Sequence, residues 1–303
     1  MCLTSFKDRK NRLKCANIYI EFTVFRRMKM NTHRLKSDPE IITEGEVSRH
    51  WDDNADVWTE HVRRGWDTFR EHLNNPAFLK LAGNLNGKKV LDAGCGEGYN
   101  TRIFARMGAK MTGIDISPRL IEYARQAEKK EPLGIRYETA SFSDLAIFKD
   151  ESFDTVVSTM ALMDSPDFDK AVIEIHRVLK KNGDFFFSVS HPCFMTKGFG
   201  WVTDRQSNQE KLTVSGYYSK TQRVEHWQFS NAPEEIKKQV EQFAIPVFPR
   251  TLAEYINPLV STGFILKKMV EPRPSVAECR EHPYLQKWRD AGSLFLLIHC
   301  VKP

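Results

Sequence analysis

The stretch Val90-Leu91-Asp92-Ala93-Gly94-Cys95-Gly96-Glu97-Gly98 decides how this chain of 303 residues folds. It joins a short apolar run to a segment with helical spacing that begins at Tyr99. Glycines in such a join let the backbone turn tightly and let a ligand come close, and the N-terminus of the next helix offers free N–H groups. The stretch therefore predicts a ligand-binding loop between a strand and the helix that follows it.

From residue 88 onward, short apolar runs alternate with helical stretches. Strand, helix, strand in that order requires crossover connections, which give a parallel sheet between two layers of helices. Two later runs are expected to complete the sheet as a hairpin. The predicted strands are 89–92, 110–115, 134–138, 153–158, 184–190, 264–270 and 294–301, and the predicted helices in this region are 99–107, 118–129 and 167–180, with Gly183 ending the last helical segment.

Three further segments differ from this alternation. The pattern over 46–83 is helical. Residues 192–249 hold few helical signals and many aromatic side chains, which predicts an insertion of short strands and loops over the sheet. After the insertion, a helix is expected to run to Thr262, with Thr251 as its N-cap and Gly263 as its C-cap.

The formal charge of +6 is concentrated near the start of the chain. Residues 1–36 hold ten Lys or Arg side chains and only two acidic ones, which leaves 35 basic and 37 acidic residues in the rest. A nucleic-acid-binding protein carries its basic residues as a patch on the folded body, so we expect no nucleic-acid partner. Residues 1–44 are predicted to be a disordered basic tail, or to reflect an over-long translation start with Met28 or Met30 as the true one.

Six scattered cysteines without a C-x-x-C pair argue against a structural zinc site and against a disulfide framework, and they fit the reducing cytoplasm. No apolar run approaches the ~18 residues of a membrane span. The run 16–25 contains Asn17 and Glu21 and lacks the cleavage site of a signal peptide. The sequence thus predicts a cytoplasmic protein with no membrane partner and no metal.

Asp115 supplies a second signal of a nucleotide site. It ends the next predicted strand 17 residues after Gly98, where its carboxylate can accept both hydroxyls of a ribose. An NAD-type oxidoreductase would need G-x-G-x-x-G/A, with a small residue at position 99. Tyr99 occupies that position, which disfavours a dinucleotide site.

The spacing D-x-G-x-G-x-G over Asp92–Gly98 resembles the first motif of the class I S-adenosylmethionine-dependent methyltransferases. Other segments resemble later landmarks of that family, over about residues 88–190: Gly113-Ile114-Asp115-Ile116-Ser117-Pro118, Phe153-Asp154 and Arg177-Val178-Leu179-Lys180-Lys181-Asn182-Gly183. Ser190-His191-Pro192-Cys193-Phe194 and Arg250–Tyr255 are similar to a small-molecule, type 11-like branch. The resemblance implies a Rossmann-like α/β fold with a seven-stranded, mostly parallel sheet flanked by helices.

This fold gives a division of the chain into functional parts. Residues 45–303 would form the methyltransferase domain. Within it we expect a helical lid at 45–84, a cofactor-binding core at 85–191, a substrate cap at 192–249, and a C-terminal helix and strand hairpin at 250–303.

The resemblance also implies S-adenosyl-L-methionine as the cofactor. Asp92 would bind its ammonium group, directly or through water, and Asp115 would hold the ribose diol. Gly94, Gly96 and Gly98 would shape the wall behind the methionine part and the ribose.

For the adenine, the resemblance implies Ile116 against one face, and the aromatic ring of Phe142 suits the other. Family members often carry an acidic residue near position 141 that binds the adenine amino group. This chain has Ser141 there, with the nearest carboxylate at Asp144, and both stay open for this role. The loop that holds Met160 is expected to face the transferred methyl group.

Methyl transfer from a sulfonium requires an aligned nucleophile, exclusion of water and, for some acceptors, removal of a proton. His191 is the first candidate base, because it ends the fifth strand and its ordinary pKa of about 6.5 suits the role. A structural turn at His191-Pro192 is the alternative. Asp164 is the second candidate base. Arg64 and Arg70 in the lid could meet a carboxylate or be solvated.

The sequence therefore predicts an enzyme that transfers a methyl group to an oxygen, nitrogen or carbon of a small molecule. The loop at 158–162 lacks the Asn/Asp-Pro-Pro-Tyr/Phe motif typical of methylation of exocyclic amines. The alternatives are a tRNA-modifying methyltransferase, an NAD-type oxidoreductase and a cofactor-binding protein without catalysis. Aromatic residues of the lid and cap could line the acceptor pocket or form the cap's own core: Trp51, Trp58, Trp66, Trp201, Tyr217, Tyr218 and Trp227.

Overall fold

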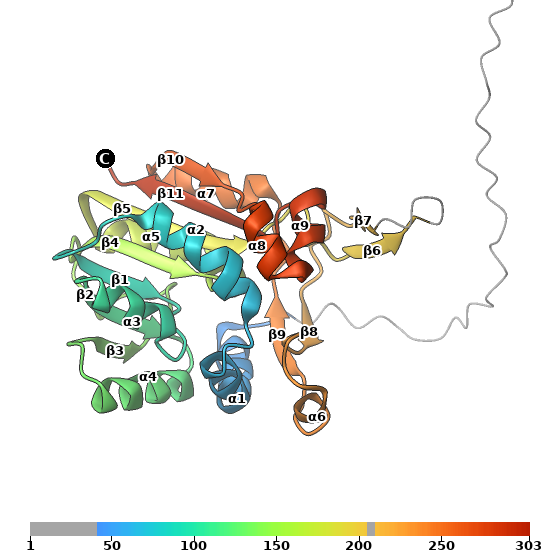
Figure 1. The fold of residues 1–303 in the computed structure, drawn as a ribbon. Coiled ribbons are helices and arrows are strands. Elements are labelled where there is room, and N and C mark those ends of the chain that lie inside the picture. Colours follow the sequence, from blue (N-terminus) through green and yellow to red (C-terminus); the bar gives the residue numbers. More distant parts are fainter. Residues whose placement is uncertain (1–40, 205–209) are drawn as a thin grey trace, which may run out of the picture. The chain divides into compact units, whose positions relative to one another are not determined.

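The computed structural model describes residues 41–204 and 210–303 (Figure 1). These residues belong to the compact unit Pro39–Pro303. Residues 1–40 lie outside the described part of the chain, and so does almost all of the predicted basic tail. The first described helix starts at Glu44, which is the last residue of that predicted tail.

A seven-stranded sheet forms the centre of the unit, in the order β10-β11-β5-β4-β1-β2-β3. All pairs among β1 to β5 are parallel, whereas β11 is antiparallel to both β5 and β10. This arrangement confirms the predicted mostly parallel sheet. The strands are β1 Lys89–Ala93, β2 Lys110–Asp115, β3 Arg136–Thr139, β4 Phe153–Thr159, β5 Leu179–Ser190, β10 Ile265–Val270 and β11 Phe295–Val301.

Helices cover both faces of the sheet because neighbouring strand residues point to opposite sides. Leu91 packs in one apolar cluster with α5 and α7, whereas Val90 packs in another with α2, α3 and α4. Both side chains are fully buried. The helices are α2 Asn75–Ala82, α3 Tyr99–Arg106, α4 Pro118–Lys130, α5 Phe168–Val178 and α7 Leu252–Thr262.

The helix ends follow the capping rules used in the prediction. Thr251 accepts a hydrogen bond from the backbone of Glu254 and forms a reciprocal capping box at the start of α7, and Gly263 ends the helix with φ of 99°. Gly83 ends α2 with φ of 65°. These three boundaries lie where the sequence placed them.

The end of α5 was predicted wrongly. The helix stops at Val178 and β5 starts at Leu179, so Gly183 lies inside the strand rather than after a helix. The strand begins irregularly, because its pairing with β4 jumps from Leu179 to Asp184, and Asn182 has a positive φ of 60°. Helical spacing in the sequence continued into a segment that pairs with the sheet instead.

The connection between β10 and β11 also differs from the predicted hairpin. The two strands are antiparallel neighbours, but three helical pieces lie between them: α8 Val276–Glu281, η3 Pro283–Leu285 and α9 Gln286–Ala291. Trp288 of α9 is buried and stacks on Phe199 at a ring distance of 5.7 Å. The helical pieces between β10 and β11 thus support the segment that is inserted after β5.

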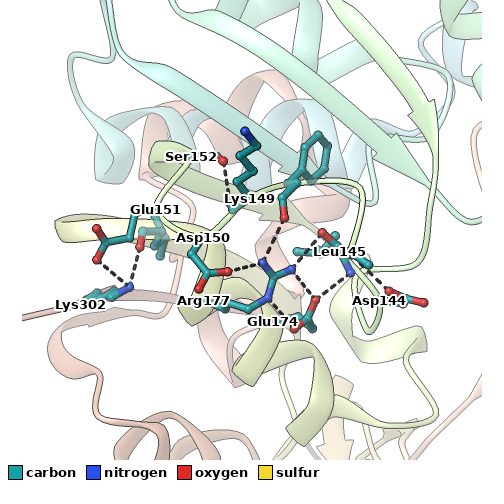
Figure 2. Close-up of polar contacts among 12 residues, drawn as sticks. Asp144, Leu145, Lys149, Asp150, Glu151, Ser152, Glu174, Arg177 and Lys302 are labelled. Carbon is teal, nitrogen blue, oxygen red and sulfur yellow. Dashed lines mark hydrogen bonds and ion pairs between the residues drawn. The ribbon is translucent and has the colours of Figure 1, made fainter.

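Arg177, in the last turn of α5, fixes the connection from β3 to β4 (Figure 2). Its Nη1 donates to the Phe148 carbonyl at 3.0 Å and to Asp150 at 2.7 Å, and its Nη2 donates to the Leu145 carbonyl at 2.9 Å. Glu174 binds both Arg177 and the backbone N–H of Leu145. This network holds the segment that follows the end of β3.

Two further regions lie outside the sheet, one before β1 and one between β5 and β10 in the sequence. The N-terminal region contains α1 Glu44–Arg63 and a π-helical turn, η1 Arg70–Asn74, before α2. The segment after β5 forms two separate two-stranded ribbons, β6 Gly200–Thr203 with β7 Glu210–Thr213, and β8 Arg223–Trp227 with β9 Phe243–Val247, and a short helix, α6 Glu234–Lys237. Ribbon β8–β9 lies beside α1 (Figure 1), and the ring of Trp58 on α1 contacts the rings of Trp227 and Phe243.

Candidate active site

A cavity of about 730 Å³ lies at the carboxyl ends of β1, β2, β4 and β5. Its walls also include residues of α1, of η1 and of ribbon β8–β9. Ligands of open α/β sheets bind at this edge of the sheet. The cavity brings together nine of the residues predicted for the site: Asp92, Gly94, Gly96, Asp115, Ile116, Ser141, Phe142, Met160 and Asp164. Gly98 and His191 are not among its lining residues.

The glycine loop between β1 and α3 needs its glycines for two different reasons. Gly94 has φ of 84°, and a Cβ there would lie 2.3 Å from the Cβ of Ala161 across the cavity floor. Gly98 has φ of 86°, and a Cβ there would lie 2.5 Å from the hydroxyl of Tyr137. Gly94 therefore lets the β4 loop approach the cavity, whereas Gly98 lets β3 pack behind it.

Asp115 and Asp92 are buried carboxyl groups with fixed orientations. Asp115 accepts hydrogen bonds from the backbone N–H groups of Gly96 at 2.8 Å and Ser117 at 2.9 Å. Asp92 accepts one from the Thr101 hydroxyl at 2.6 Å. Burial raises the pKa of Asp115 to about 6 and the pKa of Asp92 to about 7, because water no longer solvates the charged forms.

Glu44, in the first turn of α1, supplies a carboxylate that sequence reasoning missed. It lines the cavity and accepts a hydrogen bond from the Ser141 hydroxyl at 2.9 Å. Asp144 does not line the cavity; its carboxylate accepts from the backbone N–H of Ala146 at 3.2 Å. Only the fold joins Glu44 to Ser141, since 97 residues separate them in the sequence.

Asp164 ends a short 3-10 turn, η2 Leu162–Asp164, directly after β4. It is 6% exposed, and burial raises the pKa of its carboxyl group well above the usual range, partly opposed by the nearby Arg250 guanidinium. Arg250 donates to the carbonyls of Met163 at 3.2 Å and of Ser165. Arg250 thus holds the turn that presents Asp164 to the cavity.

His191, the first candidate base, does not line the cavity. Its side chain is 2% exposed, and both ring nitrogens are engaged: Nδ1 accepts from the backbone N–H of Cys193 at 3.2 Å, and Nε2 donates to Glu271 at 2.8 Å. Burial lowers its pKa, with Glu271 opposing. The carbonyl of His191 also accepts from the backbone of Met195 at 2.8 Å. These contacts favour the structural alternative, a turn after β5.

The two candidate arginines of the N-terminal helical region differ in location. Arg64 is largely exposed and pairs with Glu60 at 2.8 Å. Arg70 lines the cavity and lies over the ring of Tyr99, with its guanidinium carbon 4.3 Å from the ring centroid. Its Nε lies 3.4 Å from Asp67, and its buried Nη2 has no hydrogen-bond partner among the described residues. Arg70 therefore has donor capacity left for a ligand.

The aromatic residues of the N-terminal and inserted segments divide between the cavity and a local core. Trp201 packs away from the cavity, edge-on to Trp288 at 5.2 Å, and Tyr218 is 81% exposed. Part of the cavity-lining group also packs around Phe243 and Phe229. The predicted aromatics that line the cavity are Trp51, Trp58, Trp66, Tyr217 and Trp227.

Neither a metal site nor a membrane-spanning helix occurs among the described residues. Within residues 41–204 and 210–303, no three His, Cys, Asp or Glu side chains gather where they could hold a metal ion. No helix in this part of the chain is long and apolar enough to cross a membrane.

Comparison with known proteins places this geometry in a family. Residues 91–187 match the family model described as a methyltransferase domain. The crystal structure of an S-adenosylmethionine-dependent methyltransferase from Mesorhizobium loti matches with 26% identity and a TM-score of 0.62, over 75% of this chain and 96% of that one. A solved structure from Listeria monocytogenes matches with 29% identity and a TM-score of 0.59, over 75% and 95% of the two chains.

Curated relatives point the same way. An uncharacterised protein of Haemophilus influenzae is 28% identical over 75% of this chain and 86% of its own length. The ubiquinone biosynthesis O-methyltransferase of Nitrosococcus oceani is 34% identical over 52% of this chain and 65% of its own length, so the chain spans less than two thirds of that relative. The protein is a class I S-adenosylmethionine-dependent methyltransferase, and S-adenosyl-L-methionine is its cofactor. The NAD-type alternative is thereby set aside.

Proposed function

We propose that this enzyme transfers the methyl group of S-adenosylmethionine to an oxygen atom of a small molecule bound in the cavity. One observation carries the proposal: the buried carboxyl group of Asp164 lines the same cavity as the glycine loop after β1 and the carboxyl group of Asp115. A volume of about 730 Å³ is near the upper part of the ~300–1,000 Å³ range of small-molecule sites, which suits cofactor and acceptor together. The ubiquinone O-methyltransferases among the relatives support oxygen as the acceptor atom.

The cofactor would lie along the carboxyl edge of the sheet, parallel to α1. Its ribose hydroxyls would bind Asp115, whose carboxylate is oriented by Gly96 and Ser117. Its ammonium group would meet Asp92. Its carboxylate would accept hydrogen bonds from Arg70, which has an unused donor and lies over the Tyr99 ring.

The adenine would lie between Ile116 and Phe142, at the amino end of α1. Its amino group would donate to Glu44, which Ser141 orients at 2.9 Å. In this assignment Ser141 acts through Glu44, and Asp144 has no part because its carboxylate serves the turn at Ala146. The helix α1 would then contribute directly to cofactor binding.

The methyl group would face the loop after β4, where Met160 lines the cavity with a strained positive φ of 56°. Asp164 would accept the proton of the acceptor hydroxyl as the new carbon–oxygen bond forms and the carbon–sulfur bond breaks. Its raised pKa makes it a stronger base than an ordinary carboxylate, since a base works best with a pKa near the working pH. His191 has no role in the transfer and holds the β5 turn instead.

Two experiments test this function. Calorimetric titration with S-adenosylhomocysteine should show binding of about 8 kcal/mol, which is micromolar affinity. A screen of phenols, carboxylic acids and amines for release of S-adenosylhomocysteine should then yield an oxygen acceptor. Activity only on nitrogen acceptors, or only on tRNA with a steep salt dependence of binding, would contradict the proposal.

A further inference from the structure

Four side chains of the cavity carry a buried polar atom without a hydrogen-bond partner among the described residues: Arg70, Thr159, Thr196 and Arg223. Buried polar groups in folded proteins almost always have a partner, so these atoms, which line the cavity, are available to a ligand or to water that fills it. A threonine hydroxyl can donate or accept, whereas a guanidinium only donates. The two arginines therefore require acceptor groups, and anions suit them best.

Arg70 lies near the carboxyl end of α1. It covers the ring of Tyr99 at 4.3 Å, and Tyr99 packs in one cluster with Val62, which lies in the last turn of α1. Under the proposed function, this arginine takes the carboxylate of the cofactor.

Arg223 lies near the opposite end of α1. The residue before it, Gln222, accepts a hydrogen bond at 2.9 Å from the backbone N–H of Ile42, two residues before α1 begins. A helix of this length, 20 residues, extends about 30 Å. One carboxylate therefore cannot serve both guanidiniums, and the cofactor has only one carboxylate.

Arg223 stands on a strand face that is directed to the cavity. Arg223, Glu225 and Trp227 alternate along β8 and share one face, and all three line the cavity. Their partners on β9 include Val247 opposite Arg223 and Ile245 opposite Glu225, which also line it. A cation is thus placed beside an apolar and aromatic surface.

Glu225 occupies only one edge of the Arg223 guanidinium. It accepts from Nε at 2.8 Å and from Nη2, while the buried Nη1 has no partner among the described residues. Arg223 is 21% exposed and Glu225 is 46% exposed. Glu225 can therefore move into solvent when a second anion arrives, whereas Arg223 stays at the cavity wall.

We propose that the methyl acceptor is an anionic small molecule, with a carboxylate or phosphate group on Arg223 and an apolar body against Trp227, Ile245 and Val247. The proposal rests on the proposed function, because the assignment of the cofactor carboxylate to Arg70 leaves Arg223 for the acceptor. Glu225 then lowers the affinity for anions by competing for the same guanidinium.

Titration of the protein saturated with S-adenosylhomocysteine tests this inference, with three probes of equal ring size: 1-naphthoate, 1-naphthyl phosphate and the neutral 1-naphthamide. At least one anion should bind about ten- to a hundredfold more tightly than the amide, the range for hydrogen bonds to a charged group. Naphthoate and naphthyl phosphate separate the two possible anions. The matched variants Arg223→Gln and Glu225→Gln should act in opposite directions: the first removes the preference for the anion, and the second keeps or increases it.

Unchanged affinity of both variants for S-adenosylhomocysteine shows that each is folded with an intact cofactor site. An anion preference that survives Arg223→Gln overturns the proposal. So does the absence of any preference in the unmodified protein, including no binding of all three probes at millimolar concentration. Failure of S-adenosylhomocysteine itself to bind would instead overturn the proposed cofactor site, so the two failures are distinguishable.

Discussion

The two ends of the cavity are built in different ways. One end, where we propose that most cofactor contacts lie and which we call the cofactor end, is assembled from consecutive strand–loop–helix units between Lys89 and Phe142, where each loop follows its own strand. The opposite wall comes from α1, η1 and ribbon β8–β9, which are far apart in the sequence and meet only in the fold. Local sequence thus determines the first end, and long-range packing determines the second. Substitutions at each end separate their contributions.

The largest effect is expected at Asp164, in the turn after β4 that lines the cavity. Asp164→Asn should lower turnover of the acceptor found in the screen about 10²–10⁴-fold, since the base is removed, while the affinity for S-adenosylhomocysteine stays the same. Because burial raises the pKa of this carboxyl group, the rate should rise with pH as the base form accumulates, and the variant should lose that rise. Parallel losses of turnover and cofactor affinity would assign Asp164 a structural role instead.

A smaller effect is expected for Gly94→Ala in the glycine loop. Its Cβ would lie 2.3 Å from Ala161 at a φ of 84°, and strain with overpacking together cost about 2–4 kcal/mol in folding or cofactor binding. Gly96→Ala is the matched control, because a Cβ there meets nothing within 4 Å. It should cost only about 1–2 kcal/mol for its positive φ. Thermal unfolding and titration with S-adenosylhomocysteine measure the effects of both variants. Equal effects would show that the close approach of Ala161 to Gly94 does not matter.

Asp115→Asn should weaken the binding of S-adenosylhomocysteine by about 1.5–3 kcal/mol, because hydrogen bonds to a charged acceptor are lost. Asp144→Asn is the control, since that carboxylate serves the turn at Ala146. Its calorimetric affinity should match that of the unmodified protein. If Asp144→Asn weakened binding and Asp115→Asn did not, the assignment of the cofactor end would be wrong.

The last prediction concerns the pH dependence of cofactor affinity. The pKa of Asp115 is raised to about 6 and that of Asp92 to about 7, and in the proposed site the ribose and the ammonium group bind their charged forms. Affinity for S-adenosylhomocysteine should therefore approach its maximum near pH 8 and fall as pH decreases through 7 and 6, by at most about tenfold per group and pH unit. Titrations at pH 5 to 8 check this; affinity that rises toward acid would contradict it.

The difference between the two ends also explains what the sequence could predict. The spacing of Asp92, Gly94 and Asp115 reports a loop whose geometry is local, so the sheet was predicted closely, and these three residues do line one cavity. Glu44 and Arg223 could not be predicted, because their neighbours come from segments 97 residues away or from a ribbon with no motif. His191 was assigned by its place at a strand end, but its orientation depends on Glu271, which no local pattern relates to it.

Helical pieces between β10 and β11 were missed for a related reason. Residues 275–291 begin with a capping box at Ser275, but the helical pieces are short and Pro283 interrupts them. The buried Trp288 stacks on Phe199, and a long-range contact of this kind stabilises short helices without leaving a periodic pattern in the sequence.

The central claim is that α1 completes the cofactor site through Glu44. The most direct test is the crystal structure of the complex with S-adenosylhomocysteine. We expect the adenine amino group to lie within hydrogen-bond distance of the Glu44 carboxylate while the ribose hydroxyls bind Asp115. An adenine amino group bound to other residues, with Glu44 turned toward solvent, would contradict the claim.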